Sequence, residues 1–382
     1  MRVLIVGGGI AGLSTAIALK EKGIEAEIIE KHSGWRSGGA GLHLPGNAVV
    51  PMDRLGIREA VEAQSFTFHE IRYCDQKDNK LFSLNLSDDT WPQFQGISRD
   101  AFHKILVDKA GNVLVRFGSE IKALSHKQST ADTSVSVEFS DGKVSEYDLV
   151  IAADGINSST RGMLFGPEVK PVSADITCWR WTTKITNLTE PHFMLGRGKV
   201  FLLMPIGNDR AYVFASLSDP TGKFVSPNSL TSDVEVIQRE FTEFGGLVPG
   251  ILKQLEQDGP VLPGDLMQML VPQWVKGACV LVGDAAHGTL PTMAQGASMA
   301  MEDALVLADE LEENKSSIQE ALAAYQARRI ERAQWVQHQS LKRMGLARLK
   351  ARPLVFLRNK LMTAAGAKIL ASGWRPLIDK AF

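Results

Sequence analysis

Cysteine is scarce in this chain of 382 residues. The three cysteines, Cys74, Cys178 and Cys279, lie far apart in the sequence, and no CxxC pair occurs. The sequence therefore predicts neither a disulfide framework nor a zinc site, and we expect no other metal site. A reducing compartment, and with it a cytoplasmic location, fits this cysteine usage best.

Long apolar runs and an excess of charge are also missing. No run reaches the roughly 18 apolar residues that indicate a membrane-spanning helix, and the apolar stretch at the start is too short for a signal peptide. The formal net charge of −1 gives no general attraction to nucleic acid. Residues 340–382 are an exception, with ten Lys and Arg and one acid. We expect solvated helices packed on the body there; the alternative is peripheral membrane or partner contact.

The clearest motif lies in the first 30 residues. A short β-branched run leads into Gly7, Gly9 and Gly12, which give G-x-G-x-x-G, and a helical pattern and a second strand follow, closing on Glu30. In such a unit the glycines make a tight turn and let backbone N–H groups approach a pyrophosphate, and the acid reaches a ribose hydroxyl. The acid disfavours a 2′-phosphate, so FAD or NAD is expected here. The alternative is an α/β unit whose glycines only tighten a turn.

A glycine-rich loop follows the acid, where a second part of a large cofactor could lie. Its polar candidates are Arg36 and His43. Farther on, Ser98 caps a predicted helix whose first residue is Arg99. A cation in the first turn opposes the helix dipole, and a bound anion would remove that conflict. Solvated surface side chains are the alternative for all three charged or polar residues.

Two further apolar runs each end in an acid. The run before Asp154 is continuously apolar, as expected of a parallel strand buried on both faces, and so is the run before Asp284. Ligands of open α/β sheets bind at the carboxyl ends of the strands. Asp284 and the N–H groups near Gly296, at the start of a predicted helix, are therefore expected to flank one pocket.

Other segments have the alternating pattern of antiparallel strands. A hairpin is predicted over residues 69–85, and three strands over residues 176–185, 199–204 and 211–217. The remaining helices are predicted at residues 45–55, 99–109, 232–244, 297–311 and 316–343. The predicted fold class is α/β: a Rossmann-like domain with a parallel sheet that binds FAD or NAD, an antiparallel-sheet domain and C-terminal helices. The dinucleotide-binding domain is expected at residues 1–65, 91–172 and 272–340, the antiparallel-sheet domain at 66–90 and 173–271, and the helical segment at 341–382; the resemblance described next implies that the first is an FAD-binding domain and the second a substrate domain.

Three signatures occur in a fixed order: GGGIAG with Glu30, then DGINSSTR, then GDAAHGTLPTMAQGASMAMEDA. Together they resemble the single-component FAD-dependent aromatic hydroxylases, the para-hydroxybenzoate hydroxylase-like flavoprotein monooxygenases. The likeness covers roughly residues 1 to 340. It implies cofactor-binding positions at Gly7, Gly9, Gly12, Glu30, Lys31, Arg36, His43, Arg99, Asp154, Asp284, Gly296, Ala297 and Ser298. It also implies that Pro291 lies near the flavin ring and that Arg161 belongs to the middle motif.

The resemblance implies an oxidoreductase that uses NADH or NADPH and O₂ to hydroxylate an aromatic or electron-rich small molecule through a flavin C4a-hydroperoxide. The chain departs from the commonest pattern at Ser298 and Thr292, so the pocket shape is expected to be unusual. The alternatives are a flavin-dependent oxidase or halogenase-like enzyme and a non-catalytic nucleotide-binding regulator. The sequence Trp179-Arg180-Trp181-Thr182-Thr183 only mimics the start of a halogenase motif and lacks its Ile-Pro.

The substrate side of the site depends on one predicted strand. Cys178, Arg180 and Thr182 share one of its faces, and Trp179 and Trp181 share the other. If the first face meets the flavin, Arg180 could hold an anionic or phenolic substrate. If the tryptophans do, the pocket is apolar. The sequence leaves both orientations open.

Overall fold

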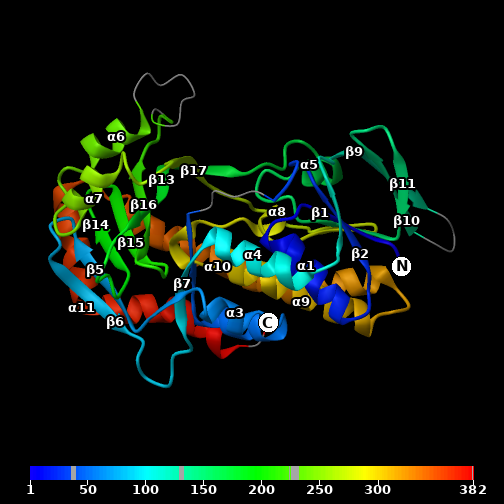
Figure 1. Cartoon of the computed structure of the whole chain (residues 1–382), viewed down its shortest axis with the longest axis horizontal. Coiled ribbons are helices and arrows are strands. Elements are labelled where there is room, and N and C mark those ends of the chain that lie inside the picture. The colour runs from blue at the N-terminus through cyan, green and yellow to red at the C-terminus, as the bar shows by residue number, and fades with distance from the viewer. Residues whose placement is uncertain (36–39, 129–132, 223, 225–231, 381) are drawn as a thin grey trace.

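A parallel sheet and an antiparallel sheet lie toward opposite ends of the molecule (Figure 1). The computed structural model describes residues 1–35, 40–128, 133–222, 224, 232–380 and 382. Within this part of the chain no helix is long and apolar enough to cross a membrane, and no cluster of three or more His, Cys, Asp or Glu could hold a metal ion.

The parallel sheet has six strands in the order β18-β19-β12-β1-β2-β8. All neighbours are parallel except β18 and β19. The bounds are β1 Val3–Val6, β2 Ala26–Glu30, β8 Leu114–Phe117, β12 Leu149–Ala152, β18 Val275–Lys276 and β19 Cys279–Leu281. Every residue of β1, β12 and β19 is buried, which confirms the predicted central strands. The strand-tip acids Asp154 and Asp284 therefore come from neighbouring strands.

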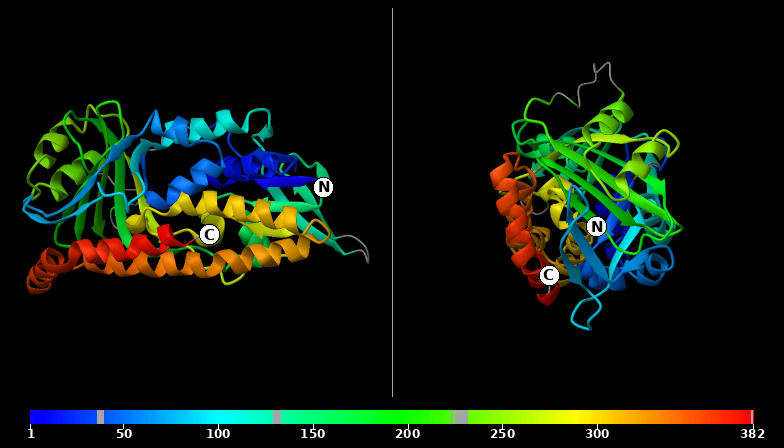
Figure 2. Two further views of the ribbon diagram at one scale, coloured as in Figure 1. Left: turned by 90° about the horizontal axis from the view of Figure 1, so that it is seen from below. Right: turned by 90° about the vertical axis from the view of Figure 1, so that its left-hand side faces the viewer.

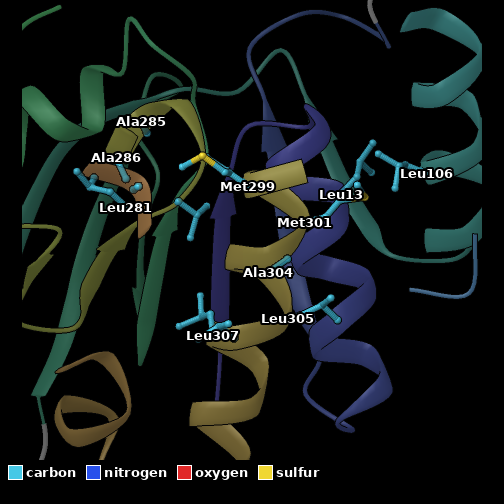
Figure 3. Close-up of a cluster of buried hydrophobic side chains, with 14 of the residues drawn as sticks. Leu13, Leu106, Leu281, Ala285, Ala286, Met299, Met301, Ala304, Leu305 and Leu307 are labelled. Atoms are coloured by element: carbon cyan, nitrogen blue, oxygen red, sulfur yellow. The ribbon is translucent and has the colours of Figure 1, made fainter. Parts of the chain in front are cut away.

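Three helices build one face of this unit: α1 Ile10–Glu21, α4 Arg99–Ala110 and α9 Gly296–Glu313. The hydroxyl of Ser98 accepts a hydrogen bond from the N–H of Ala101, as its predicted capping role requires, and Gly111 ends α4 with a φ of 63°. Figure 3 shows Met301 and Leu305 of α9 on the side of α1, with Leu13 and Leu106 near them. Close packing of these helices fixes where the N-terminal ends of α1 and α9 point.

The antiparallel sheet has seven strands in the order β17-β13-β16-β15-β14-β5-β6. Within it, β14 and β5 pair in parallel and the other neighbours pair antiparallel. The bounds are β5 Glu70–Asp75, β6 Lys80–Asn85, β13 Val172–Lys184, β14 His192–Leu195, β15 Lys199–Pro205, β16 Arg210–Ser218 and β17 Leu262–Gln268. The outer face of this sheet is covered by α6 Asp233–Glu240 and α7 Val248–Gln254 (Figure 1).

Smaller elements join these layers. One three-stranded sheet contains β3 Gly41–Leu44, β7 Phe94–Ser98 and β4 Phe66–Phe68, and another contains β11 Val144–Tyr147, β10 Thr133–Phe139 and β9 Ile121–Gln128. The short helices are η1 Gly46–Ala48, α2 Val49–Arg54, α3 Arg58–Glu62, α5 Ser159–Phe165, α8 Asp284–His287 and η2 Pro291–Met293. The helix predicted over residues 45–55 is thus split into η1 and α2, and the glycine-rich loop before it contains a strand, β3.

Two long helices, α10 Ile318–Ala347 and α11 Arg352–Asp379, run along one side of the molecule (Figure 2). The predicted helix end at Arg343 is four residues short, because α10 continues to Ala347. The junction between the two helices lies at the end of the long axis that carries the antiparallel sheet (Figure 2). From there α11 packs on β6, an edge strand of the antiparallel sheet, and on η1.

Candidate functional site

The glycine turn after β1 has two positions that packing reserves for glycine. Gly7 has a φ of 105°, and a Cβ there would lie 2.7 Å from the carbonyl oxygen of Ala153. A Cβ at Gly12 would lie 1.9 Å from the carbonyl oxygen of Gly7, so α1 could not pack at its present distance. At Gly9, by contrast, a Cβ would meet no described atom within 4 Å.

Gly9 is also the N-cap of α1, and no side chain caps this helix. No acid lies in its first turn. Backbone N–H groups therefore point from the helix N-terminus into open space, which is the arrangement that binds phosphate groups.

Glu30 is held in its ionised form at the tip of β2. Its Oε2 accepts the N–H of Gly8 at 3.0 Å, and its Oε1 accepts the N–H of His32 at 3.0 Å and lies 2.5 Å from Nδ1 of the His32 ring. Burial alone would raise the pKa of Glu30, but the hydrogen bonds from His32 and Gly8 lower it overall. A carboxylate offers about four acceptor positions, so room remains for one ribose hydroxyl on Oε2. Lys31 is exposed beside it, and Arg36 lies outside the described residues.

The polar side chains of the middle motif form hydrogen bonds with nearby backbone and side-chain groups. The carboxylate of Asp154 accepts the hydroxyl of Ser158 at 2.5 Å and the N–H of Thr160 at 3.0 Å, which fixes the turn into α5. Arg161 is 2% exposed and donates to the carbonyl oxygens of Ile156, Val169 and Ala285. This arginine thus joins the turn after β12 to the turn after β19, and burial lowers its pKa. The contacts observed for Asp154 and Arg161 hold the backbone of the two strand tips together.

The third motif places Asp284 just after β19, as the first residue of α8. Burial raises the pKa of this carboxyl, with Arg99 among the nearby charges, yet the side chain keeps exposed surface. The two observations together describe a group deep in the molecule that faces an opening. A Cβ at Gly296, the first residue of α9, would meet only Oδ1 of Asp284, at 4.0 Å. The expected meeting of Asp284 with the α9 N-terminus is therefore what the structure shows.

A buried ionic network supports this turn from behind. The carboxylate of Asp303 accepts the N–H of Gly283 at 2.8 Å, contacts Nε2 of His287 at 2.5 Å and accepts Nε of Arg329 at 2.8 Å. Asp303 and Arg329 are both 0% exposed. Glu302, the preceding residue, pairs with Arg329 as well. Because Gly283 adopts a φ of 59° directly before Asp284, the network fixes the direction of the acid.

The two faces of the antiparallel sheet belong to different cores. Trp179 and Trp181 pack into the separate outer core under α6 and α7, where Nε1 of Trp179 donates to Asp233 at 2.7 Å. The opposite face of β13, with Cys178, Arg180 and Thr182, therefore points toward the parallel sheet. The orientation that the sequence left open is the one with Arg180 on the inner face.

The polar side chains around Arg180 use only part of their hydrogen-bonding capacity. Its Nε is buried and has no hydrogen-bond partner among the described residues. The hydroxyl of Thr182, by contrast, accepts a hydrogen bond from Arg210. Tyr212, opposite Thr182 across the strands, packs so closely on β3 that a Cβ at Gly41 would lie 2.5 Å from it. Burial raises the pKa of Tyr212 strongly, although the ring keeps some accessible surface.

An aromatic wall extends the same face toward α11. The ring of Tyr73 stacks between Phe82, at 4.6 Å, and Phe193, at 4.7 Å. Burial raises the pKa of Tyr73 to about 12, while part of the ring stays accessible. Arg343 lies nearby and donates to the carbonyl oxygens of Thr292, at 3.2 Å, and Leu370, at 2.9 Å. No carboxylate pairs with Arg343 in the described part of the chain.

His43 lies among aromatic rings. It contacts Phe68 at 5.2 Å, Trp374 of α11 at 5.8 Å and Phe94 at 6.0 Å between ring centroids. Burial, with a contribution from Arg343, lowers the pKa of His43 to about 3, so the ring is neutral at physiological pH. Its Nε2 has no partner among the described residues.

Sequence reasoning missed four residues of this wall: Tyr73, Tyr212, Arg343 and Trp374. The two tyrosines could have been found by placing the predicted hairpin and strands in register. Arg343 and Trp374 lie in helices whose packing has no local sequence signal. Of the predicted positions, Pro291 is exposed, Ala297 is half-buried, and Ser298 is fully buried with a hydroxyl that has no partner in the described structure.

These features fit an FAD. The open N-terminus of α1 and the acceptor on Glu30 suit the ADP half, and Arg99 and Asp284 suit the polar middle of the cofactor. The N-terminus of α9, with no acid in its first turn, suits the electron-rich edge of a flavin ring. The free space at Gly9 and the accessible carboxylate of Asp284 belong to different strand tips. A ligand that uses both must be large, as FAD is.

Comparison with known proteins gives the same answer. The family model described as "FAD binding domain" matches residues 1–340. YetM of Bacillus subtilis, which bears the name of an FAD-dependent monooxygenase, is 33% identical over 359 residues, covering 92% of this chain and 95% of YetM. The FAD-dependent urate hydroxylase of Mycolicibacterium vanbaalenii is 30% identical over 344 residues, covering 87% of this chain and 85% of its own.

Among solved structures, a single-residue variant of Klebsiella pneumoniae HpxO complexed with FAD superposes with a TM-score of 0.86 at 25% identity, covering 99% of this chain and 98% of that one. The chain therefore belongs to the FAD binding domain family, and the relatives named above are FAD-dependent monooxygenases by name. Both the predicted resemblance and the predicted fold class are confirmed.

Proposed function

We propose that the chain uses NADH or NADPH and O₂ to insert one oxygen atom into an aromatic or similarly electron-rich small molecule. The observations that carry this proposal are Asp284, deep yet partly exposed beside the N-terminus of α9, and an aromatic wall with two arginines that have no carboxylate partner in the described structure. Bound FAD supplies the redox chemistry, accepting reducing equivalents from the nicotinamide and activating O₂. The protein supplies binding, orientation and exclusion of water.

On the cofactor side, backbone N–H groups at Gly9 would hold the pyrophosphate, and the free acceptor of Glu30 would hold the adenosine ribose. Arg99 would neutralise phosphate charge, and Asp284 would accept a ribityl hydroxyl. The α9 N-terminus, at Gly296, would stabilise negative charge on the reduced ring.

On the substrate side, we propose that the ring of the substrate lies along Tyr73 and its stacked phenylalanines. Arg343 and Arg180 would orient an oxygen atom or negative charge on that ring, because neither has a carboxylate partner in the described structure. The relatives named as urate hydroxylases act on an electron-rich heteroaromatic ring, which supports this class of substrate. Trp374 and His43 would close the substrate space at the α11 side and keep water from the reacting ring.

The test is a screen of NADH and NADPH oxidation by the FAD-loaded protein with phenols, N-heteroaromatic acids and purine-like rings. The expected result is faster oxidation with an accepted ring and a product that gains one oxygen atom from isotopically labelled O₂. Label arriving from labelled water would contradict the proposal, and so would peroxide formation alone with every ring. Arg343→Gln should raise KM for an anionic ring, whereas Arg348→Gln, at the end of the same helix but paired with Asp175 at the surface, should not.

We also propose a cellular location and a division of the chain into domains. We infer a cytoplasmic location from the three cysteines, which are free and buried. We also keep the division into an FAD-binding domain at 1–65, 91–172 and 272–340, a substrate domain at 66–90 and 173–271, and a helical segment at 341–382.

A further inference from the structure

The two faces of α11 differ in their surroundings. A stripe at intervals of four residues, Arg358, Met362, Gly366 and Leu370, is buried against the body. A Cβ at Gly366 would lie 2.3 Å from the ring of Phe82. This side of the helix is therefore fixed by packing on β6 and leaves the opposite side turned outward.

The outward side is apolar. Leu354, Leu357 and Leu361 share one side of the helix and are 50%, 65% and 46% exposed, and Phe356, 66% exposed, lies on the other flank of the outward surface. We call these four residues the outer apolar row of α11. The other large exposed apolar residues of the described chain are dispersed over many elements. The junction that begins α11 lies at one extreme of the molecule (Figure 2), where Nε of Arg197 donates to the carbonyl oxygen of Lys350 at 3.0 Å. Four large apolar side chains within eight residues of one exposed helix indicate a contact surface.

The charges that the helix itself places around the row are positive. No Asp or Glu occurs between residues 332 and 378, although the whole chain has a net charge of −1. Arg352, Lys360 and Lys368 of α11 are exposed, and the ammonium of Lys360 lies 5.6 Å from the ring centroid of Phe356. The acids nearest the junction come from other elements: Asp175 pairs with Arg348, and Asp75 shares a surface depression with Arg352 and Phe356.

We propose that the outer apolar row of α11 docks on an anionic lipid bilayer, with the helix axis in the plane of the surface. Apolar side chains between cations are what an interfacial helix needs: the former enter the headgroup region and the latter attract anionic lipid. Within the described chain no helix can span a bilayer, so the contact would lie on the surface. A second copy of this face is a poorer occupant, because it would bring the same cations together.

The same helix contributes to the aromatic wall. Trp374 of α11 contacts His43, and its Nε1 donates to the carbonyl oxygen of Met293 at 3.1 Å. Docking would therefore place the α11 side of the proposed substrate space next to the lipid. This consequence rests on the proposed function, whereas the docking itself does not.

The test is flotation of the FAD-loaded protein with vesicles of phosphatidylcholine alone or with one-third phosphatidylglycerol. We expect binding only to the anionic vesicles, and release as salt is raised. The double variant Phe356→Ser/Leu357→Ser should bind them at least tenfold more weakly. The matched control is Leu114→Ser/Val144→Ser, which changes two residues that are 65% and 62% exposed in other elements and should bind like the wild type.

Three results would overturn the proposal. The first is no binding of the wild type to anionic vesicles at low salt, and the second is equal binding by both double variants. The third is concentration-dependent self-association without vesicles that only Phe356→Ser/Leu357→Ser abolishes, which would assign the row to a second copy. Flavin content and NAD(P)H oxidation, measured on the same samples, report the proposed function separately.

Discussion

Replacing Asp303 by asparagine should damage both the stability of the fold and the cofactor site. The carboxylate accepts the N–H of Gly283 and the Nε of Arg329 and contacts the ring of His287, all without solvent exposure. An asparagine amide has the same size as the carboxylate but carries no charge. Its NH₂ group would also face one of the three nitrogen atoms, of Gly283, His287 and Arg329, that now contact the carboxylate. Burial by itself would raise the pKa of Asp303, but His287 and Arg329 lower it overall.

Breaking one side of a buried ion pair costs about 3–5 kcal/mol. The lower part of that range is expected, because Glu302 still pairs with Arg329 after the change. With an unfolding entropy of about 2.1 cal/mol/K per residue, a loss of about 3–4 kcal/mol lowers Tm by about 4–5 °C for a chain of 382 residues. The lowered pKa sets the sign with pH: this stabilisation is present above the ordinary carboxyl pKa and is lost as pH falls through the folded-state value.

The assay is thermal and urea unfolding of the flavin-free protein, followed by FAD titration. The matched control is Asp309→Asn, farther along α9, which breaks a surface pair with Arg54 and Lys22 and should cost at most about 1 kcal/mol. Asp303→Asn should also weaken FAD binding, because it releases the Gly283 turn that aims Asp284. Equal small losses in both variants, or unchanged FAD affinity in a destabilised Asp303→Asn, would refute this reasoning.

Three further outcomes are expected. Gly12→Ala should lose stability and FAD binding together because its Cβ would meet the oxygen of Gly7 at 1.9 Å, whereas Gly9→Ala should lose only FAD binding; unfolding and FAD titrations separate the two cases. His43 stays neutral in the folded protein, whereas the unfolded chain takes up the proton as pH falls. The free energy of unfolding should therefore fall by about 1.4 kcal/mol between pH 7.5 and 5.5. His43→Gln should remove this contribution to the pH dependence, as measured by urea unfolding. Arg99→Ala should lower FAD affinity most at low ionic strength, and a salt-independent affinity equal to the wild type would return Arg99 to a surface role.

Most of the fold follows from local patterns in the sequence. Buried parallel strands are apolar throughout and antiparallel strands alternate, so both sheets were predictable from periodicity. The helix over residues 99–110 was marked at both ends, by Ser98 and Gly111. The strands β3, β14 and β17 were missed because each depends on a partner far away in the sequence. Pairing of this kind has no local signal.

The site was predictable where a motif defines it and not where packing does. Glycines and strand-tip acids occupy fixed places in a βαβ unit, which is why Gly9 and Asp284 could be named in advance. The orientation of Arg180 depended on which face of β13 the helices α6 and α7 cover. Arg343 and Trp374 reach the aromatic wall only because α10 and α11 fold back along the body. The individual cofactor contacts, those of Arg36 and Ser298 included, stay predictions.

The central claim is that FAD binds where the tips of β1, β2 and β19 meet the N-termini of α1 and α9. The most direct measurement is titration of the flavin-free protein with FAD, comparing the wild type with Asp284→Ala. The account predicts one FAD per chain in the wild type and, for the variant, a loss on the order of 1 kcal/mol or more, which is about fivefold or more in Kd. A protein that binds no FAD, or an Asp284→Ala variant with wild-type affinity, would contradict it.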